Sequence, residues 1–135
     1  MNRNLFGALV LMAVALVVNV NAQNKERADV PFDFVVGDNV LPAATYDISE
    51  VAAHAMLIRD FKNGNSMMIQ FHPADGKPQL HDKLVFHKCG ERYFLYQVWN
   101  ADGDGIQVHE SRLEREQTLA SNEASSPQEV VVALR

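Results

Sequence analysis

The sequence predicts a small all-β domain: an antiparallel meander, barrel-like, with one short helix near the C-terminus and a β-sandwich as the alternative. In many short segments, apolar and polar residues alternate with a period of two, which is typical of strands that bury one face. Gly, Pro, Asn and Asp residues separate these segments at short intervals, as in hairpin turns. Closure of such a meander into a barrel removes exposed sheet edges, which favours the barrel over the sandwich.

The N-terminal segment has the features of a secretory signal peptide covering residues 1–22. Arg3 gives it a positive start, an apolar run covers residues 5–18, and Ala22 ends a small-residue cleavage pattern. The run is shorter than the roughly 20 residues of a membrane span. We therefore predict export to the periplasm or outside the cell, with no membrane span after cleavage. Residues 23–29 are predicted to form a flexible leader, and residues 30–135 a single β domain.

Composition and charge argue against nucleic-acid binding and against an internal disulfide. The chain has 12 Lys and Arg against 17 Asp and Glu, and the basic residues are scattered. Nucleic-acid binding needs a basic patch for the phosphate backbone, so we expect no nucleic-acid partner. Cys89 is the single cysteine, so no disulfide can form within the chain.

The first two strands are predicted at residues 30–36 and 44–51, joined through a turn at residues 37–39. Apolar residues occupy every second position of the first strand, and these are Val30, Phe32, Phe34 and Val36. Tyr46 and Ile48 share one face of the second strand in the same way. Both strands are expected to build the core rather than a working site.

Four more strands are predicted at residues 56–59, 67–71, 83–88 and 92–99. Asn63-Gly64 is a strong hairpin signal between the first two of them, and Gly90-Glu91 is a tight turn between the last two. Residues 73–81 form a loop with two prolines and a glycine. The strand at residues 92–99 is apolar on both faces, so we expect it to be central and covered on both sides.

The C-terminal part is predicted to contain a strand at residues 106–109, one helix, a loop at residues 122–128 and a strand at residues 129–134. Ser111 and Glu114 have the spacing of a capping box, which places the start of the helix at Ser111. The helix has a thin apolar stripe, made by Leu113, Leu119 and Ala120. This stripe predicts that the helix lies on the sheet.

The chain resembles a family of small exported acidobacterial proteins in four blocks, ADVPFDFVVGDNVLPAATY, MLIRD, KLVFHKCGERYFLYQVW and ESRLERE. The resemblance covers nearly the whole chain after the signal peptide. It implies export and a β-rich fold, and it brings no catalytic residue. The LPAATY block is also similar to the LPAGTY hairpin of other extracytoplasmic β-domains. Ala44 replaces the glycine there, and a left-handed backbone is costly for alanine, so we expect a different turn.

The motifs of familiar enzymes are incomplete in this sequence. The stretch HESRL begins like a zinc-protease helix but has one histidine where two are required. The stretch DGDG at residues 102–105 lacks the remaining carboxylates of a calcium loop and is interpreted as a hairpin turn. We therefore expect no enzyme activity, no catalytic residues and no cofactor.

The strongest candidates for metal binding are His87 and Cys89, with His72 and His81 as further ligands. His87 and Cys89 stand two residues apart on a predicted strand, so both point to the same face. Imidazole and thiolate together suit Cu(I) or Zn(II). The alternative interpretation is that Cys89 packs as a small apolar residue and His87 is partly exposed.

Six aromatic residues are candidates for the barrel interior: Phe32, Phe34, Phe86, Phe94, Tyr96 and Trp99. They form either a packed core or the lining of a ligand cavity. Three hypotheses for function follow. The first is a non-enzymatic exported domain that binds or scaffolds an envelope or extracellular protein, for instance through an exposed strand edge. The second is a carrier of a small apolar ligand, and the third is a metal or enzymatic site at His87 and Cys89.

Overall fold

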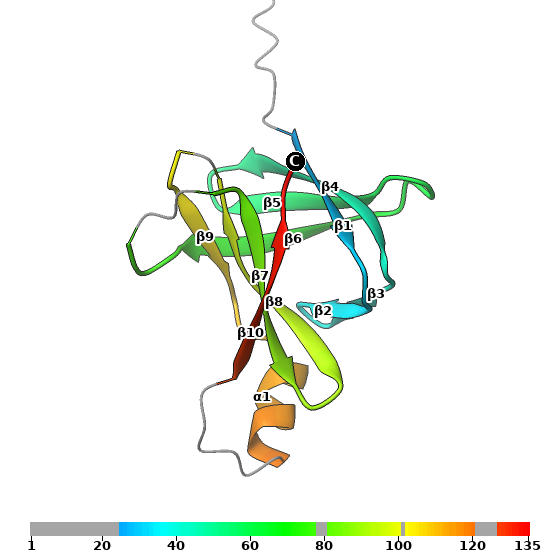
Figure 1. The fold of residues 1–135 in the computed structure, drawn as a ribbon, viewed down its shortest axis with the longest axis vertical. Coiled ribbons are helices and arrows are strands. Elements are labelled where there is room, and N and C mark those ends of the chain that lie inside the picture. The colour runs from blue at the N-terminus through cyan, green and yellow to red at the C-terminus, as the bar shows by residue number, and fades with distance from the viewer. Residues whose placement is uncertain (1–24, 78–80, 101, 121–126) are drawn as a thin grey trace, which may run out of the picture.

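The computed structural model describes residues 25–77, 81–100, 102–120 and 127–135, which contain ten strands and one helix (Figure 1). The strands are β1 (Lys25–Val30), β2 (Phe34–Val36), β3 (Asn39–Leu41), β4 (Ala44–Ala52), β5 (Ala55–Asp60), β6 (Ser66–Pro73), β7 (Lys83–Cys89), β8 (Arg92–Trp99), β9 (Gly105–Val108) and β10 (Gln128–Ala133). The helix is α1 (Arg112–Ala120). The predicted all-β class with one short C-terminal helix is confirmed. The predicted signal peptide lies outside the described residues.

Strands β1, β4, β5 and β6 form one antiparallel wall, in which each strand pairs with the next. The hairpin predicted at Asn63-Gly64 joins β5 to β6. Gly64 there has φ +70°, a left-handed backbone that glycine adopts without a steric penalty. From β4 to β6 the wall follows the expected meander, because its turns are short and leave the next strand beside the last. Between β1 and β4 the chain passes through β2 and β3, so that pair is not a hairpin.

A second wall runs in the order β9, β8, β7, β10, again antiparallel, and β9 also pairs with β6, which joins the two walls. The predicted central strand, residues 92–99, is β8. It pairs with β7 along one edge and with β9 and β2 along the other. The β2–β8 pairing is parallel, and β3 follows β2 at the end of the sheet. The predicted antiparallel meander is therefore wrong at β2.

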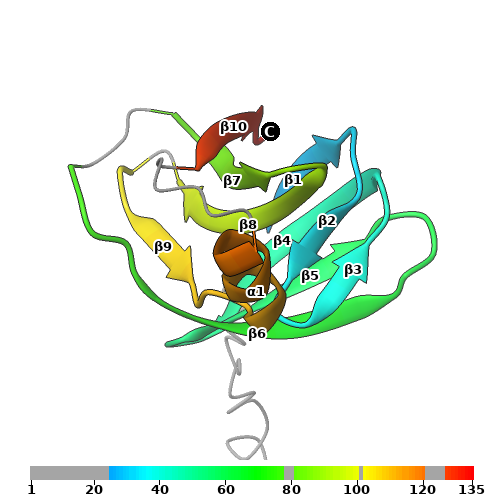
Figure 2. The same cartoon turned by 90° about the horizontal axis from the view of Figure 1, so that it is seen from below.

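The sheet curves strongly but stays open, so the predicted barrel-like sheet does not close into a barrel (Figure 2). In the described part of the chain, β1 meets the C-terminal end only at an isolated bridge between Ala28 and Leu134. Next to this bridge, Arg27 and Arg135 exchange two backbone hydrogen bonds: the Arg27 amide donates to the Arg135 carbonyl at 3.0 Å, and the Arg135 amide donates to the Arg27 carbonyl at 2.9 Å. A continuous ladder would need several such pairs, and no ladder joins β1 to β10 among the described residues.

The inner face of the curved sheet is a continuous apolar core. Phe34, Phe86 and Tyr46 meet there edge to face, with ring centres 5.3–5.4 Å apart. Phe86 belongs to this core, whereas Phe94 and Trp99 are buried outside the same cluster. The aromatic interior thus packs against itself, and Phe32 stacks on Tyr93 at 3.8 Å at its margin. Tyr96 instead lies partly exposed and stacks on His87.

Hydrogen bonds fix the conformation of the LPAATY block, and they have a structural role. The Tyr46 hydroxyl donates a hydrogen bond to the Pro42 carbonyl, and the Ala43 amide donates to the Asp33 carboxylate at 2.9 Å. Burial, and then the charges of Asp60 and Asp33, raise the pKa of Tyr46 to about 12. Tyr46 therefore stays a neutral hydrogen-bond donor at any ordinary pH.

The flexible leader predicted at residues 23–29 is wrong from Lys25 onward, because residues 25–30 form strand β1. This strand pairs with β4 over its whole length. Ala28 and Val30 on its inner face are buried. The strand is hard to predict from the sequence because polar residues occupy its outer face and one end of its inner face, which leaves too few apolar residues to show the period of two.

Helix α1 begins as predicted, since the Glu114 amide donates to the Ser111 hydroxyl at 3.0 Å. It lies at the lower end of the curved sheet in Figure 1 and in front of the sheet in Figure 2, which is seen from below. None of its residues is buried. Within the predicted stripe Leu113 is half-buried and Leu119 is 74% exposed, so the helix lies at the sheet as predicted, but little of its apolar stripe is covered. No helix within the described residues has the length and apolarity needed to cross a bilayer.

We expect Gly105→Ala to destabilise the domain by about 1–3 kcal/mol, the usual range for overpacking. Gly105 pairs with Trp99 across β9 and β8, and an added Cβ would stand 2.5 Å from the Trp99 ring. Urea unfolding of the two proteins measures this difference. In a Trp99→Leu background the same change should be nearly neutral, because the ring is gone. An equal penalty in both backgrounds would contradict the steric explanation.

Candidate functional site

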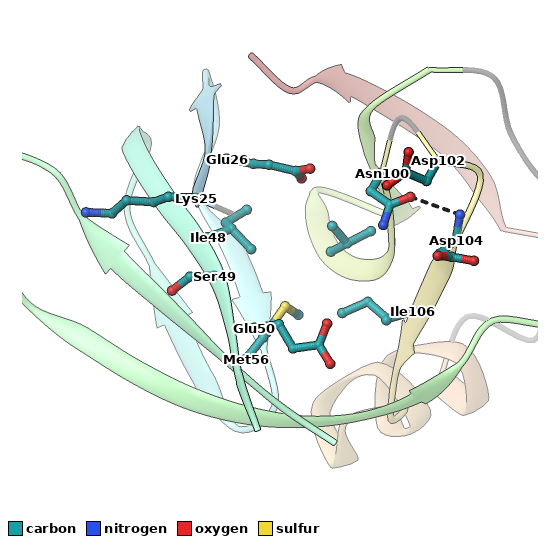
Figure 3. Close-up of a pocket in the computed structure, with 11 residues that line it drawn as sticks. Lys25, Glu26, Ile48, Ser49, Glu50, Met56, Asn100, Asp102, Asp104 and Ile106 are labelled. Atoms are coloured by element: carbon teal, nitrogen blue, oxygen red, sulfur yellow. Dashed lines mark hydrogen bonds between the residues drawn. The ribbon is translucent and has the colours of Figure 1, made fainter. Parts of the chain in front are cut away.

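A cavity of about 420 Å³ lies between β1 and β4 on one side and β9 with its preceding turn on the other (Figure 3). We call this cavity the cup, and its lining residues are Lys25, Glu26, Ile48, Ser49, Glu50, Met56, Val98, Asn100, Asp102, Asp104 and Ile106. The start of β1 and the β8–β9 turn lie at the upper end of Figure 1, opposite α1. The volume falls in the range of small-molecule sites.

The floor of the cup is apolar and belongs to the core. Ile48, Met56 and Val98 are buried core residues, and Ile106 is half-buried beside them. Val98 and Ile106 lie directly opposite each other on β8 and β9. Side chains packed this firmly into the sheet provide a preformed surface for an apolar group.

The rim of the cup carries carboxylates at positions where the inner face would ordinarily be apolar. Glu26 lies opposite Ile48 in the β1–β4 ladder, and Glu50 lies opposite Met56 in the β4–β5 ladder. Residues directly opposite across a ladder share a face. Both glutamates therefore continue the inward-facing rows of their strands, and Figure 3 shows them directed toward the cavity.

Among the described residues that line the cup, Lys25 is the only cation, and it is turned away from the cavity. Lys25 Nζ lies 3.4 Å from Asp47 Oδ2, and its side chain points away from the other lining residues in Figure 3. Burial, and then the charge of Asp82, raise the pKa of Glu26 above its ordinary value of 4.5. The Oδ1 atom of Asp82 is itself buried without a hydrogen-bond partner in the described residues. The rim thus carries excess negative charge that a cation would relieve.

The β8–β9 turn holds the opposite rim in place. The Asp104 amide donates to the Asn100 side-chain oxygen at 2.9 Å, and the Asn100 amide donates to the Asp104 carbonyl at 3.0 Å. Gly103 adopts a left-handed backbone, φ +85°, inside this turn. The predicted hairpin turn at residues 102–105 is therefore present, and it positions Asp102 and Asp104 over the cup.

A second hollow, about 580 Å³, lies where β1 and β4 meet the β5–β6 turn, with Pro31 and Pro42 among its lining residues. Val30 is its one lining residue from the buried apolar core. It therefore lacks the apolar floor of the cup.

The predicted pair His87 and Cys89 lies on β7, but His87 is engaged by other residues. Its ring stacks on Tyr96 with centres 3.8 Å apart, and its Nδ1 lies 3.2 Å from Glu114 Oε1 on α1. The side chains of His87 and Glu114 are only 14% and 12% exposed. Cys89 is partly buried at the end of the same strand. The contact between His87 and Glu114 therefore ties α1 to the sheet.

The other two candidate histidines lie elsewhere. His81 is exposed before β7, and His72 on β6 lies beside His109, which follows β9. The described residues contain no group of three or more His, Cys, Asp or Glu arranged to hold a metal. The predicted four-residue set of His72, His81, His87 and Cys89 is therefore not brought together.

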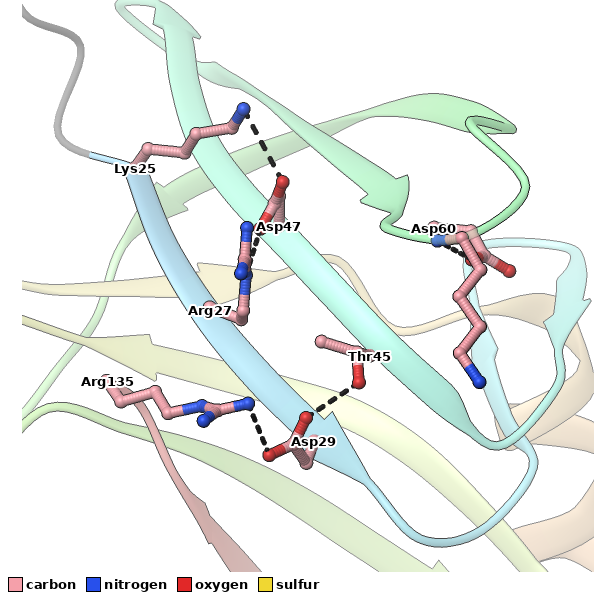
Figure 4. Close-up of polar contacts among 8 residues, drawn as sticks. Lys25, Arg27, Asp29, Thr45, Asp47, Asp60 and Arg135 are labelled. Carbon is pink, nitrogen blue, oxygen red and sulfur yellow. Dashed lines mark hydrogen bonds and ion pairs between the residues drawn. The ribbon is translucent and has the colours of Figure 1, made fainter.

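The outer face of β1 and β4 carries a polar network (Figure 4). Arg27 Nε donates to Asp47 Oδ1 at 2.8 Å, and this bond, more than any other contact, lowers the pKa of Asp47. Lower on the same face, Thr45 donates to Asp29 at 2.7 Å and Arg135 pairs with Asp29 at 2.8 Å. This network holds β1 against β4 and against the C-terminal end.

Comparison with protein-family models, with curated proteins and with solved structures gives no match for this chain. Sequence reasoning missed Glu26 and Glu50, although a signal was present. Each glutamate extends a period-two row, Glu26-Ala28-Val30 on β1 and Tyr46-Ile48-Glu50 on β4, at its outer end.

Proposed function

We propose that the protein is an exported, non-enzymatic binding domain whose cup holds a small ligand with an apolar body and a cationic group. The observation that carries the proposal is the pair of inward-facing carboxylates, Glu26 and Glu50, above an apolar floor. The apolar body rests on Met56, Val98 and Ile106, and the cation lies between the rim carboxylates. The net charge of −5 favours the approach of such a ligand.

A matched ligand series tests this proposal. n-Hexylamine, n-hexanol and hexanoate share an apolar chain and differ in charge, and their binding can be followed by amide chemical shifts in ¹H–¹⁵N spectra. We expect the amine to bind most tightly, the alcohol less tightly and the carboxylate least, with shifts at Ile48, Val98 and Ile106. Equal binding of amine and carboxylate, or shifts confined to residues outside the cup, would contradict the proposal.

Replacing Glu26 by glutamine should weaken hexylamine binding about fivefold, which corresponds to about 1 kcal/mol for one partly screened charge pair. The same change should raise stability slightly, by about 0.5 kcal/mol or less after solvent screening. The reason is that burial and Asp82 raise the pKa of Glu26, so the ionised carboxylate destabilises the fold above the ordinary pKa of 4.5.

The pH dependence of hexylamine binding follows from the raised pKa of Glu26. As the pH falls through the raised pKa, Glu26 takes up a proton and the amine loses a partner, so wild-type affinity should decline from neutral pH toward pH about 4.5. Calorimetric titration at several pH values measures this, and Glu26→Gln should show a flatter profile. Glu91→Gln, in the exposed β7–β8 turn, is the matched control and should behave as wild type.

A second candidate function is binding of an envelope or extracellular protein at the β3 edge. β3 ends the sheet, and its Val40 is 62% exposed, so this edge offers unpaired backbone groups next to an apolar side chain. A photo-crosslinker placed at Val40 in the native host should then capture a defined partner. The same probe at Val131, exposed on β10, should not, and equal labelling from both positions would contradict the idea.

A further inference from the structure

Two histidines outside the cup lie side by side. His72 is on β6 and pairs with Gln107 of β9 in the ladder, and His109 follows β9 directly. Their ring centres are 4.7 Å apart, and the ring planes are inclined at 42°. The rings are thus neither stacked in parallel nor perpendicular to each other, in contrast to the stacked pair His87 and Tyr96.

His72 has a nitrogen with an unmet bonding requirement. Its Nδ1 atom is buried and has no hydrogen-bond partner among the described residues. Buried side-chain polar atoms nearly always have a partner, and each exception needs a physical reason. A metal ion is such a reason, because the neutral imidazole nitrogen is a common metal ligand.

The spacing of the two rings matches a shared metal. A nitrogen–metal bond of about 2.0 Å places an imidazole ring centre about 3.2 Å from the ion. With one nitrogen of each ring directed at the same ion, ring centres 4.7 Å apart subtend an angle of about 95° there. This is close to the right angle between neighbouring ligands in the tetragonal geometry that Cu(II) prefers.

We propose that His72 and His109 form a binding site for a divalent transition-metal ion that takes Cu(II) most tightly. Imidazole suits Zn(II), Ni(II) and Cu(II), and the Irving–Williams order places Cu(II) first among them. The remaining coordination positions face solvent beside the exposed His109 and accept water or a small ligand. The bound ion ties β6 to the segment that leads into α1.

Copper titration of the purified protein tests the site. We expect one Cu(II) per chain, with nitrogen hyperfine structure in the electron paramagnetic resonance spectrum. His109→Ala removes an exposed ligand and should weaken binding at least about tenfold, the lower limit found even for indirect partners of a metal. His81→Ala and His54→Ala remove other exposed histidines and should leave the affinity unchanged. Wild-type affinity in His109→Ala, or a loss in His81→Ala, would overturn the proposal.

A thermal measurement gives a second readout. An ion that binds only the folded state raises the unfolding temperature as its concentration rises. Excess Cu(II) should therefore raise the unfolding temperature of the wild type and of His81→Ala, with Zn(II) producing a smaller rise. His109→Ala should unfold at the wild-type temperature without metal and show no rise with it. An equal rise in His109→Ala would place the copper elsewhere and contradict the site.

Discussion

Replacing Phe86 by alanine is expected to lower the free energy of unfolding by about 3–5 kcal/mol, the range for emptying an aromatic core position. Phe86 is 0% exposed. Its ring meets Phe32 edge to face at 5.0 Å and Phe34 at 5.4 Å. Its loss leaves a cavity between β7 and the β2 segment, because a ladder on each edge fixes β7 and prevents collapse. Urea unfolding followed by tryptophan fluorescence measures the change.

The matched control for this variant is Phe61→Ala, which removes the same side chain from the surface. Phe61 is 52% exposed, and its ring lies under the Arg27 guanidinium at 3.9 Å. That contact is worth about 0.5–1 kcal/mol, so the control should lose no more than this. Similar losses in the two variants would mean that Phe86 does not lie in a packed core.

Replacing Asp47 by alanine is expected to lower stability at neutral pH by about 1.5–3 kcal/mol, the contribution of a hydrogen bond to a charged group. Asp47 is 6% exposed, accepts the hydrogen bond from Arg27 and lies 3.4 Å from the Lys25 ammonium. Without it, β1 loses its main polar contact with β4. The exposed Asp75→Ala is the control and should change stability by less than about 0.5 kcal/mol.

The pH profile separates this contribution from packing. The Arg27 hydrogen bond holds the pKa of Asp47 below its ordinary value of 3.8. The folded-state pKa is therefore lower than the unfolded one, so the stabilisation is present above pH 3.8 and is lost as the pH falls through the folded pKa. The stability curves of wild type and Asp47→Ala should converge once the pH falls below the lowered pKa of Asp47. If the difference in unfolding free energy between the two proteins is unchanged at pH 2, the loss of stability in Asp47→Ala comes from packing and not from the charge of Asp47.

Much of the strand pattern could be predicted from the sequence because alternation and turn residues are local signals. The bounds of β8, the Asn63-Gly64 hairpin and the Ser111 cap are examples. The pairing of strands could not be predicted, because a period of two identifies a buried face without identifying the neighbour. The parallel β2–β8 contact and the unclosed seam between β1 and β10 depend on those unseen neighbours.

The candidate site was harder to predict for a related reason. His87 and Cys89 stood out because they are close in sequence, yet the partner of His87 is Glu114, 27 residues away on α1. His72 and His109 come together only because β6 pairs with β9. Glu26 belongs to β1, which looked like a polar leader, so its inward direction became visible only once the β1–β4 register was known.

The seam between Arg27 and Arg135 gives the domain a mechanical weak point. The two backbone strands run antiparallel there and end close together, as the C-terminal mark beside β1 shows in Figure 1. A force that pulls these two ends apart acts across the hydrogen bonds and breaks them one after another, rather than shearing many at once. The sheet should thus unzip from this side at low force, and tension between its two ends would open the rim of β1 first.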